Sequence, residues 1–208
     1  MENNTILYRG AEAEICYCYY HSNPAVQKRR VKKRYRIEEI DKKLISSRTK
    51  EEAKLISDSR RQGVSVPIIY DVNLQDGIIT MEYLNGERIK DILNDLSEDK
   101  RIKICMLIGE SIAKLHNGNI IHGDITTSNM ILYNNRIHFI DFGLGGKNGE
   151  TEAQGVDLHV LMEAIESTHS KYSKCFKYVL DGYDKKLKKD SSQVIKKIDE
   201  IVKRGRYR

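Results

Sequence analysis

The segment from His122 to Asn129, taken with the aspartate that follows it, constrains the fold of this 208-residue chain more than any other feature. It places Asp124 and Asn129 five residues apart in one loop, and Asp141 follows twelve residues after Asn129. Two short apolar runs lie between them, around Asn134-Asn135, a pair that predicts a tight hairpin turn. The order of loop, hairpin and aspartate therefore brings three polar side chains together at one point.

A carboxylate and two further oxygen donors at one point suit the transfer of a terminal phosphoryl group. One carboxylate must orient the attacking hydroxyl or water, or accept its proton, and other oxygens must hold Mg²⁺ against the phosphates. Mg²⁺ prefers carboxylate and amide oxygens. The alternative is that Asp124 caps a turn and Asp141 ends a strand by chance, and three matches at this spacing argue against it.

With Asp141-Phe142-Gly143 after the hairpin, the pattern resembles the catalytic loop and the D-F-G magnesium motif of protein kinases. That resemblance implies ATP and Mg²⁺ as cofactors, with Asp124 as the catalytic carboxylate and Asn129 and Asp141 as metal ligands. It also implies that Asp157, in Gly155-Val156-Asp157-Leu158, gives the catalytic loop structural support.

The hydrophobic pattern predicts an α+β chain whose character changes near Asn85-Gly86. Residues 1–84 are expected to form a small antiparallel-sheet N-lobe with one main helix, and residues 85–208 a helical C-lobe with a basic tail. This is a minimal bilobal protein-kinase-like fold. Strands are expected at Thr5–Arg9, Ala13–His21, Ala25–Arg30, Ile68–Val72, Ile78–Tyr83, Met130–Tyr133 and Arg136–Ile140. Helices are expected at Glu38–Gln62, Arg88–Leu96, Glu98–Asn117 with Ser97 as its N-cap, Ala153–Ser167, Lys171–Lys186 and Ser191–Lys203.

A protein-kinase-like N-lobe must supply a lysine for the phosphates and a glutamate that holds this lysine. Lys28 lies at the end of the third expected strand, which matches the lysine of the V-A-I-K motif. Lys32 and Lys33 compete for the role, but they fall in the basic segment after the strand. We choose Lys28, and we choose Glu52 on the long helix as its partner, with Glu51 as the second candidate.

Two further parts of the N-lobe are candidates for nucleotide contacts. The first turn contains Gly10, Ala11, Glu12 and Ala13, and it stands in place of a glycine-rich loop, since no G-x-G-x-x-G precedes Lys28. Protein kinases hold adenine through backbone groups where the lobes join. The resemblance therefore implies contacts from the Glu82 carbonyl and the Leu84 amide.

The charge distribution and the cysteines indicate which partners and which cellular compartment are expected. It carries 36 Lys plus Arg against 30 Asp plus Glu, a formal charge of +6, with basic clusters at 28–36, 185–189 and 203–208. These clusters suit an anionic partner such as RNA, and the alternative is a solvated basic surface. Cys16 and Cys18, two residues apart, are expected on one face of a strand, in the core. No cysteine pair has zinc-site or disulfide spacing, which indicates a reducing compartment. No apolar run is long enough to span a membrane and no signal peptide is visible, so a cytoplasmic protein is expected.

The positions at which the chain differs from ordinary protein kinases indicate a closer resemblance to one smaller family of kinases. The catalytic loop has Gly123 in place of arginine and Thr126 in place of lysine, and no A-P-E motif follows Asp141. In these respects the chain resembles the small kinases of the KEOPS complex, the PRPK family, over nearly its whole length. The matching segments are Arg9-Gly10-Ala11-Glu12-Ala13, Tyr35-Arg36, Arg48-Thr49, His122 to Asn129, Ile140 to Gly145, Val156-Asp157-Leu158-His159, Glu166-Ser167-Thr168-His169 and Arg204-Gly205-Arg206-Tyr207. Lys32 departs from the family, which is expected to have proline there.

This resemblance implies a protein that binds the threonylcarbamoyl transferase subunit and other subunits of KEOPS, with tRNA as a partner in the complex. It implies ATP hydrolysis during the synthesis of threonylcarbamoyladenosine on tRNA. Serine/threonine phosphorylation, including autophosphorylation, is also attributed to this family. Some archaeal members are fused behind the transferase, and the sequence leaves open whether this chain is separate or part of a fusion.

The sequence also bears on three alternative functions. A regulatory protein kinase needs a platform for a peptide, and Leu144–Gly155 is short for one. A small-molecule kinase of the aminoglycoside-kinase-like type shares the H-G-D motif but usually carries a larger helical insertion, for which the chain between Asn129 and Asp141 leaves no room. A non-catalytic RNA-binding module explains the basic clusters but not Asp124 with its two partners. The sequence does not specify the phosphate acceptor, although the short segment after Asp141 favours water.

Overall fold

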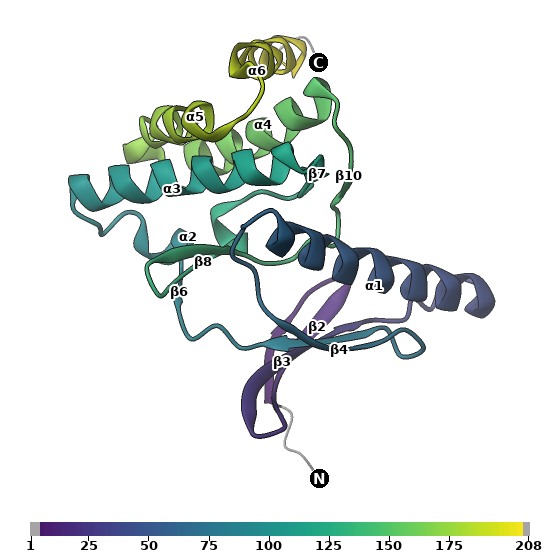
Figure 1. Ribbon diagram of the computed structural model, residues 1–208. Coiled ribbons are helices and arrows are strands. Elements are labelled where there is room, and N and C mark those ends of the chain that lie inside the picture. Colours follow the sequence, from purple (N-terminus) through teal and green to yellow (C-terminus); the bar gives the residue numbers. More distant parts are fainter. Residues whose placement is uncertain (1–4, 206–208) are drawn as a thin grey trace. The chain divides into compact units, whose positions relative to one another are not determined.

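The computed structural model describes residues 5–205, so residues 206–208 of the expected basic tail lie outside the described part. The chain divides into two compact units (Figure 1). Unit 1 comprises Met1–Ser57 and Pro67–Leu84, and unit 2 comprises Asp58–Val66 and Asn85–Arg208. No helix within residues 5–205 combines the length and the apolar character that a membrane crossing requires.

Unit 1 is built on a five-stranded antiparallel sheet with the strand order β1-β2-β3-β5-β4. The strands are β1 (Thr5–Arg9), β2 (Ala13–Tyr20), β3 (Asn23–Arg30), β4 (Ile69–Asn73) and β5 (Ile78–Glu82). The main helix, α1, spans Glu38–Arg61. This arrangement confirms the small antiparallel sheet with one main helix. The third strand starts earlier than expected because His21 and Ser22, both with positive φ, form the turn.

The core of unit 1 lies between the sheet and α1. Ala53 of α1 packs with Ile79 and Met81 of β5 in one buried cluster. Cys16 and Cys18 alternate with outward-facing residues on β2 and are buried, as expected for a strand with one core face. The same alternation holds at the end of β3, where Lys28 and Arg30 are buried on one face and Arg29 between them is exposed.

Unit 2 is mainly helical, as predicted. Its helices are α2 (Ile89–Ile92), α3 (Glu98–Asn117), α4 (Thr151–Thr168), α5 (Cys175–Lys186) and α6 (Ser191–Gly205), with two 3-10 turns, η1 (Thr127–Asn129) and η2 (Ser170–Tyr172). Its short strands are β6 (Glu87–Arg88), β7 (Ile120–Ile121), β8 (Met130–Tyr133), β9 (Arg136–Phe139) and β10 (Gly146–Lys147). The hairpin between β8 and β9 turns at Asn134-Asn135, and both asparagines have positive φ, which confirms the turn signal.

Two glycines allow α3 and α5 to pack closely. A Cβ atom at Gly109 would lie 1.9 Å from the Val179 carbonyl oxygen, and one at Gly182 would lie 2.1 Å from the Met106 carbonyl oxygen. The two backbones therefore approach too closely for any side chain at these positions. This contact fixes α3, whose C-terminal end leads into β7 and the loop that follows it.

Three local expectations for unit 2 are wrong. The helix expected at Arg88–Leu96 is reduced to α2, because Arg88 instead pairs with Ile131 in the β6–β8 ladder. The helix expected at Lys171–Lys186 is split into η2 and α5, and the Arg101 guanidinium covers the Tyr172 ring at 3.6 Å. Ile140 lies outside β9. Ser97 does occupy the N-cap position of α3, but its side chain makes no capping hydrogen bond.

Candidate active site

The loop after β7 is anchored by a buried carboxylate from α4. Asp157, which is 1% exposed, accepts hydrogen bonds of 2.8 Å from the backbone N–H groups of both His122 and Gly123. Each oxygen of the carboxylate takes one of these bonds. His116 Nε2 lies 3.4 Å from Asp157 Oδ2 on its other side, and His116 Nδ1 lies 2.8 Å from the Tyr183 hydroxyl. Asp157 thus fixes the start of the predicted catalytic loop.

Gly123 occupies a position that only glycine fits. Its φ is +83°, and a Cβ atom there would lie 2.2 Å from the Leu144 carbonyl oxygen. Both the left-handed backbone and the close approach favour glycine. This explains in physical terms why the loop has Gly123 where ordinary protein kinases have arginine.

His122 connects the loop to Ile140, the residue that precedes Asp141. Its Nε2 donates to the Ile140 carbonyl oxygen at 3.1 Å, and its Nδ1 accepts from the backbone N–H of Asp124 at 3.3 Å. These roles require the neutral ring with the proton on Nε2. Burial accordingly holds the pKa of His122 below its usual value. The Phe142 ring packs against it with the ring centroids 4.5 Å apart.

Asp124 and Asn129 form one hydrogen-bonded unit. The Asn129 Nδ2 group donates to Asp124 Oδ2 at 2.8 Å and to the Asp124 carbonyl oxygen at 3.0 Å. The backbone N–H of Ile140 donates to the Asn129 carbonyl oxygen at 3.0 Å, so η1 lies beside the chain that enters Asp141. Because Nδ2 faces Asp124, the amide oxygen Oδ1 lies on the opposite branch of the side chain.

Asp141 has an uncommon backbone conformation for an aspartate, with a φ of +64°. Its Oδ1 accepts the backbone N–H of Gly143 at 3.2 Å, and the residue is exposed. Backbone strain of this kind persists where the surrounding structure fixes it, and it is often found at functional sites.

The donor set in unit 2 fits Mg²⁺ and does not fit a metal that needs an all-protein cage. Within residues 5–205, no group of three or more His, Cys, Asp or Glu side chains is arranged to hold a metal ion. Mg²⁺ typically takes one or two protein oxygens and completes its shell with water and substrate phosphates. Asp141 Oδ2 and Asn129 Oδ1 are oxygens of this kind, so the role of these two residues as ligands stays a prediction consistent with their chemistry.

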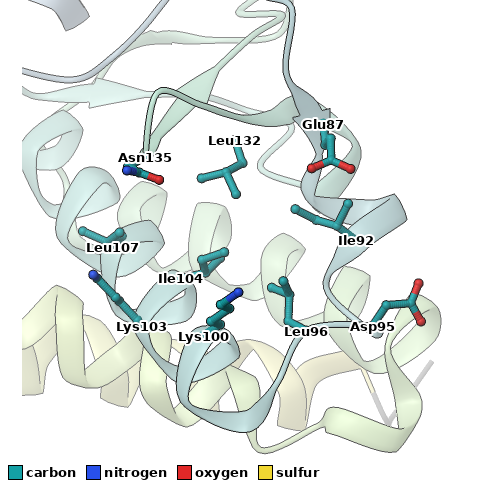
Figure 2. Close-up of a pocket in the computed structure, with 10 residues that line it drawn as sticks. All are labelled: Glu87, Ile92, Asp95, Leu96, Lys100, Lys103, Ile104, Leu107, Leu132 and Asn135. Atoms are coloured by element: carbon teal, nitrogen blue, oxygen red, sulfur yellow. The ribbon is translucent and has the colours of Figure 1, made fainter.

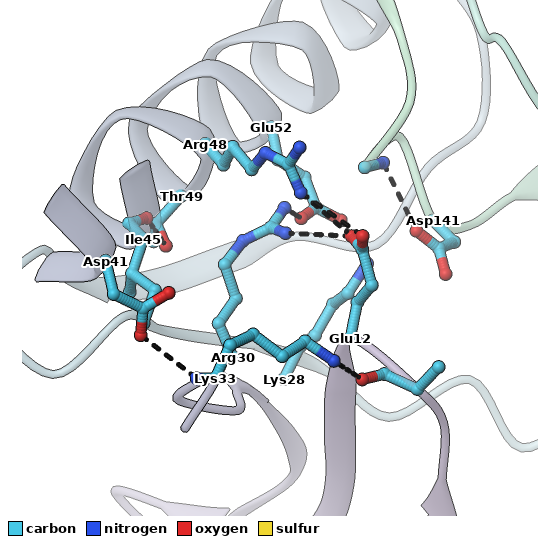
Figure 3. A network of polar contacts seen from close by, with 12 residues as sticks. Glu12, Lys28, Arg30, Lys33, Asp41, Ile45, Arg48, Thr49, Glu52 and Asp141 are labelled. Carbon is cyan, nitrogen blue, oxygen red and sulfur yellow. Dashed lines mark hydrogen bonds and ion pairs between the residues drawn. The ribbon is translucent and has the colours of Figure 1, made fainter. Parts of the chain in front are cut away.

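Among the three candidate lysines of unit 1, Lys28 faces the helix (Figure 3). Lys28 Nζ lies 2.5 Å from Glu52 Oε1, and both side chains are buried. Glu52 is thus the partner, as chosen over Glu51. Lys32 is exposed, and Lys33 Nζ donates to the Ala11 carbonyl oxygen. That Lys28 contacts phosphate stays a prediction.

The other predicted nucleotide-binding residues lie at the ends of strands in unit 1. The turn between β1 and β2 is closed by a 2.9 Å hydrogen bond from Gly10 N–H to the Ala13 carbonyl oxygen. Glu12, in this turn, lies 3.2 Å from Arg48 of α1. Glu82 is the last residue of β5. Leu84 is the last residue of unit 1, and its side chain is buried. Their contacts with adenine stay predictions.

Two residues with polar contacts around the candidate site were not assigned a role from the sequence. Arg30 joins Lys28 on Glu52, and its position two residues after Lys28 on one strand is a signal that could have revealed it. His169 appeared only as part of a motif. In the structure it is buried, with Nε2 3.1 Å from Thr127 Oγ1 in η1 and Nδ1 2.8 Å from Asn94 Oδ1.

A cavity of about 630 Å³ in unit 2 lies away from these residues (Figure 2). Its walls come from α2, α3 and the β8–β9 hairpin, with Ile104, Leu107 and Leu132 among apolar residues and Lys100 and Lys103 at its border. The lining contains neither Asp124 nor Asp141, so this cavity is not the candidate active site.

The antiparallel sheet with one main helix, the helical unit and the anchored loop around Asp124 define a protein of the protein-kinase-like class. Comparison with known proteins narrows the class. The model of the RIO domain family matches residues 19–156, which is more than half of the chain.

Three relatives are similar over nearly the whole chain. The "KEOPS complex subunit Bud32" of Pyrococcus abyssi is 46% identical, covering 98% of this chain and 96% of the relative. The "Probable serine/threonine-protein kinase BUD32 homolog" of Archaeoglobus fulgidus is 41% identical, covering 97% and 95%. The "Probable bifunctional tRNA threonylcarbamoyladenosine biosynthesis protein" of Methanobrevibacter smithii is 43% identical over 98% of this chain, and this chain spans 37% of its length. The chain therefore belongs to the RIO-domain family and, within it, to the Bud32 family.

A solved structure shares the fold. The crystal structure of the Rio2 kinase-ADP/Mg²⁺-phosphoaspartate complex from Chaetomium thermophilum matches with a TM-score of 0.64 and 15% sequence identity. The match covers 96% of this chain and 70% of that chain. The expected α+β protein-kinase-like fold is thus confirmed.

Proposed function

We propose that this protein is an ATP- and Mg²⁺-dependent phosphotransferase of the KEOPS complex, acting mainly as an ATPase that supports threonylcarbamoyladenosine formation on tRNA. The kinase chemistry and the KEOPS membership follow from the Bud32 family to which the chain belongs. The single observation that carries the catalytic proposal is the 2.8 Å hydrogen bond from Asn129 to Asp124, in a loop that Asp157 anchors. It holds a carboxylate in one orientation before any substrate arrives.

Each unit contributes groups of its own to the proposed chemistry. Residues 1–84 act as the nucleotide-binding lobe, in which Lys28 contacts the phosphates and the Gly10–Ala13 turn, Glu82 and Leu84 contact the nucleotide. Residues 85–208 act as the catalytic lobe, in which Asn129 and Asp141 hold Mg²⁺. The ion neutralises charge on the phosphates when it is bound. Asp124 orients the attacking oxygen and accepts its proton.

We propose water as the main acceptor because the chain after Asp141 is short and tied down. β10 pairs with β7, with Gly146 opposite Ile121 and Lys147 opposite Ile120. Asn148 N–H donates to the Asn119 carbonyl oxygen at 2.9 Å, and α4 then begins at Thr151. Little chain is left to hold an extended peptide beside Asp124, whereas water needs no such platform.

The partners follow from the names of the relatives and from the charge distribution. A bifunctional relative, in which a region 43% identical to this chain is part of a longer protein, supports association with the threonylcarbamoyl transferase subunit. Through KEOPS it also supports association with other subunits and with tRNA. In the basic cluster at 28–36, Arg29, Lys32 and Arg34 are exposed and available to tRNA phosphates. We place the protein in the cytoplasm, since no pair of its four cysteines has disulfide-framework spacing, which suits a reducing compartment.

The experiment that tests this function measures ATP turnover by the full chain alone and with the transferase subunit, with tRNA and with both. Free phosphate and phosphoprotein are quantified in the same reaction. The proposal predicts that the partner and tRNA stimulate turnover and that free phosphate dominates, with weak serine/threonine autophosphorylation when the protein is alone. A product pool dominated by stoichiometrically phosphorylated partner would instead indicate a protein kinase.

A further inference from the structure

His169 joins the end of α4 to the proposed catalytic loop. It directly follows α4, and its backbone N–H donates to the Ile165 carbonyl oxygen at 2.8 Å. Its Nε2 lies 3.1 Å from Oγ1 of Thr127 in η1, which stands between Asp124 and Asn129 in the sequence. His169 and Thr127 are each only 1% exposed. The chemistry proposed above gives neither of them a role.

The second ring nitrogen of His169 decides in which direction the bond to Thr127 runs. Nδ1 lies 2.8 Å from the amide oxygen of Asn94, and this oxygen can only accept, so Nδ1 carries the ring proton. Burial, aided by the positive charge of Lys90, holds the pKa of His169 below its usual value and keeps the ring neutral. A neutral ring with its proton on Nδ1 leaves Nε2 as an acceptor. The Thr127 hydroxyl therefore donates to His169, and its direction is set.

Asn94 is itself held in place, although it is exposed. It lies between α2 and α3, and the Arg101 guanidinium of α3 donates to the carbonyl oxygens of Leu93 at 3.0 Å and Asn94 at 3.3 Å. Arg101 Cζ also lies 3.6 Å from the centroid of the Tyr172 ring. The Tyr172 N–H in turn donates to the His169 carbonyl oxygen at 2.7 Å. One arginine thus fixes both the acceptor of Nδ1 and the segment that carries His169.

The direction of the Thr127 hydroxyl matters because Thr127 begins η1. This short turn is closed by the N–H of Asn129, which donates to the Thr126 carbonyl oxygen at 3.0 Å. The side chain of Asn129 leaves the same turn and donates to Asp124 Oδ2 at 2.8 Å. A rotation of η1 would therefore move the Asn129 amide away from Asp124.

Apolar burial alone does not account for this arrangement. Ile125 and Met130, on either side of η1, are both 0% exposed and keep the loop in the core without any polar contact. An apolar side chain at position 169 would fill the same space and avoid the cost of taking an imidazole and a hydroxyl out of water. A hydrogen bond instead has a preferred direction, which hydrophobic contacts lack. The bond between His169 and Thr127 therefore specifies orientation more than it adds burial.

We propose that His169 is a positioning residue for Asp124 and Asn129, acting through the Thr127 hydroxyl. It holds η1 in the rotation at which the Asn129 amide meets the Asp124 carboxylate. Its effect on turnover is indirect, because its ring reaches this pair only through Thr127. This inference rests on the proposed function, since it assumes that Asp124 and Asn129 carry out ATP turnover.

The test measures kcat for ATP turnover by the full chain, with the transferase subunit, tRNA, Mg²⁺ and ATP all saturating. H169L and T127V each remove the hydrogen bond and should lower kcat about tenfold, the effect of one net hydrogen bond on a rate. H169Q keeps hydrogen-bonding groups for Thr127 and Asn94 and should stay within about threefold of wild type. S167A is the matched control, because Ser167 Oγ is exposed and donates to the Glu163 carbonyl oxygen of its own helix, and its kcat should equal that of wild type.

The double variant H169L/T127V separates positioning from a general loss of stability. If His169 acts through Thr127, H169L should cause no further loss of kcat when T127V is already present. Urea unfolding of each variant gives its folded fraction, so that kcat can be expressed per folded molecule. Tenfold losses that multiply to about a hundredfold would overturn the inference. So would a wild-type kcat in either single variant, or a kcat of H169Q as low as that of H169L.

T127V keeps the inference testable where H169L does not fold, because valine has nearly the shape of threonine and leaves His169 in place. A tenfold lower kcat of T127V beside an unchanged S167A supports the inference. A wild-type protein that turns over no ATP under these conditions would overturn the proposed function itself, which separates that failure from the others.

Discussion

Asn129 holds the carboxylate of Asp124 through a 2.8 Å hydrogen bond from its Nδ2 group. The residue that the sequence assigned to metal binding therefore also orients the proposed catalytic carboxylate. In the proposed mechanism one amide serves two purposes: its nitrogen holds Asp124, and its oxygen, on the opposite branch, is left for the metal. This dual use makes Asn129 unusually sensitive to chemically small changes.

Asn129→Asp tests this relationship. The variant keeps an oxygen for the metal but replaces the donating amide nitrogen by an oxygen that repels Asp124. Turnover should fall about a hundredfold, as expected when a catalytic group is displaced by about 1 Å. Ser128→Ala, a neighbour in η1, is the control and should stay close to wild type in the same steady-state assay. Turnover of Asn129→Asp at the wild-type rate would show that the hydrogen bond has no role.

Gly123→Ala should distort the loop. The new Cβ would lie 2.2 Å from the Leu144 carbonyl oxygen, at a φ of +83° that disfavours alanine. The free energy of unfolding should fall by about 1–3 kcal/mol, and ATP turnover should fall with it. Thermal unfolding measures the first effect. Gly146→Ala is the matched control, because a Cβ there meets nothing within 4 Å, and equal stability of the two variants would contradict the account.

Lys28→Ala should reduce ATP turnover far more than Lys32→Ala or Lys33→Ala. Lys28 is buried against Glu52, whereas Lys32 is exposed and Lys33 is bonded to the backbone of Ala11. The comparison requires kcat and KM for ATP of all three variants. Equal losses at the three positions would mean that the segment acts through its general charge, for example on RNA.

Stability should decrease as the solution is acidified from about pH 7.5 to 5.5. Burial lowers the pKa of both His122 and His169 in the folded protein, and Lys90 adds to the effect at His169. The unfolded chain therefore binds more protons once the pH falls below the ordinary histidine value of about 6.5, and it gains up to about 1.4 kcal/mol per pH unit for each histidine. Above that pH both histidines are neutral in both states, and the effect vanishes.

Urea unfolding at several pH values measures this dependence. His169→Gln should keep hydrogen bonds with Thr127 and Asn94 while removing one titrating group. Its stability should depend less steeply on pH than that of wild type. An unchanged slope would show that His169 does not contribute.

Much of the fold could be predicted because it rests on local signals. The turn at Asn134-Asn135 and the alternation of Cys16 and Cys18 are set by residues close together in the sequence, and the structure confirms both. The short pairing of β7 with β10 was not predicted. It joins two residues at Ile120–Ile121 to two at Gly146–Lys147, a length too small to give a periodic pattern. The helix expected from Arg88 does not start there for a similar reason, because the pairing of Arg88 with Ile131 of β8 overrides the local preference for helix.

In the candidate site, too, some contacts could be predicted from the sequence and others depend on tertiary packing. The spacing of Asp124, Asn129 and Asp141 pointed to the loop and its hairpin, and Glu52 was found as the partner of Lys28 from its place on the helix. The sharing of Glu52 with Arg30 was not predicted, because composition alone does not separate a buried cation from an exposed one within a run of basic residues. Only the alternation of the strand, which puts Arg30 on the face of Lys28, separates them. The bond of His169 to Thr127 joins residues 42 positions apart and depends on tertiary packing.

The central claim is that Asp124 serves the chemical step and Asp141 serves the metal-bound nucleotide. The most direct measurement determines, for Asp124→Ala and Asp141→Ala, both the affinity for ATP with Mg²⁺ and the rate of ATP turnover, with the exposed Asp181→Ala on α5 as control. The account predicts that Asp124→Ala binds ATP nearly as wild type does but does not turn it over, and that Asp141→Ala loses Mg²⁺-dependent binding as well as turnover. Full turnover by Asp124→Ala would contradict it.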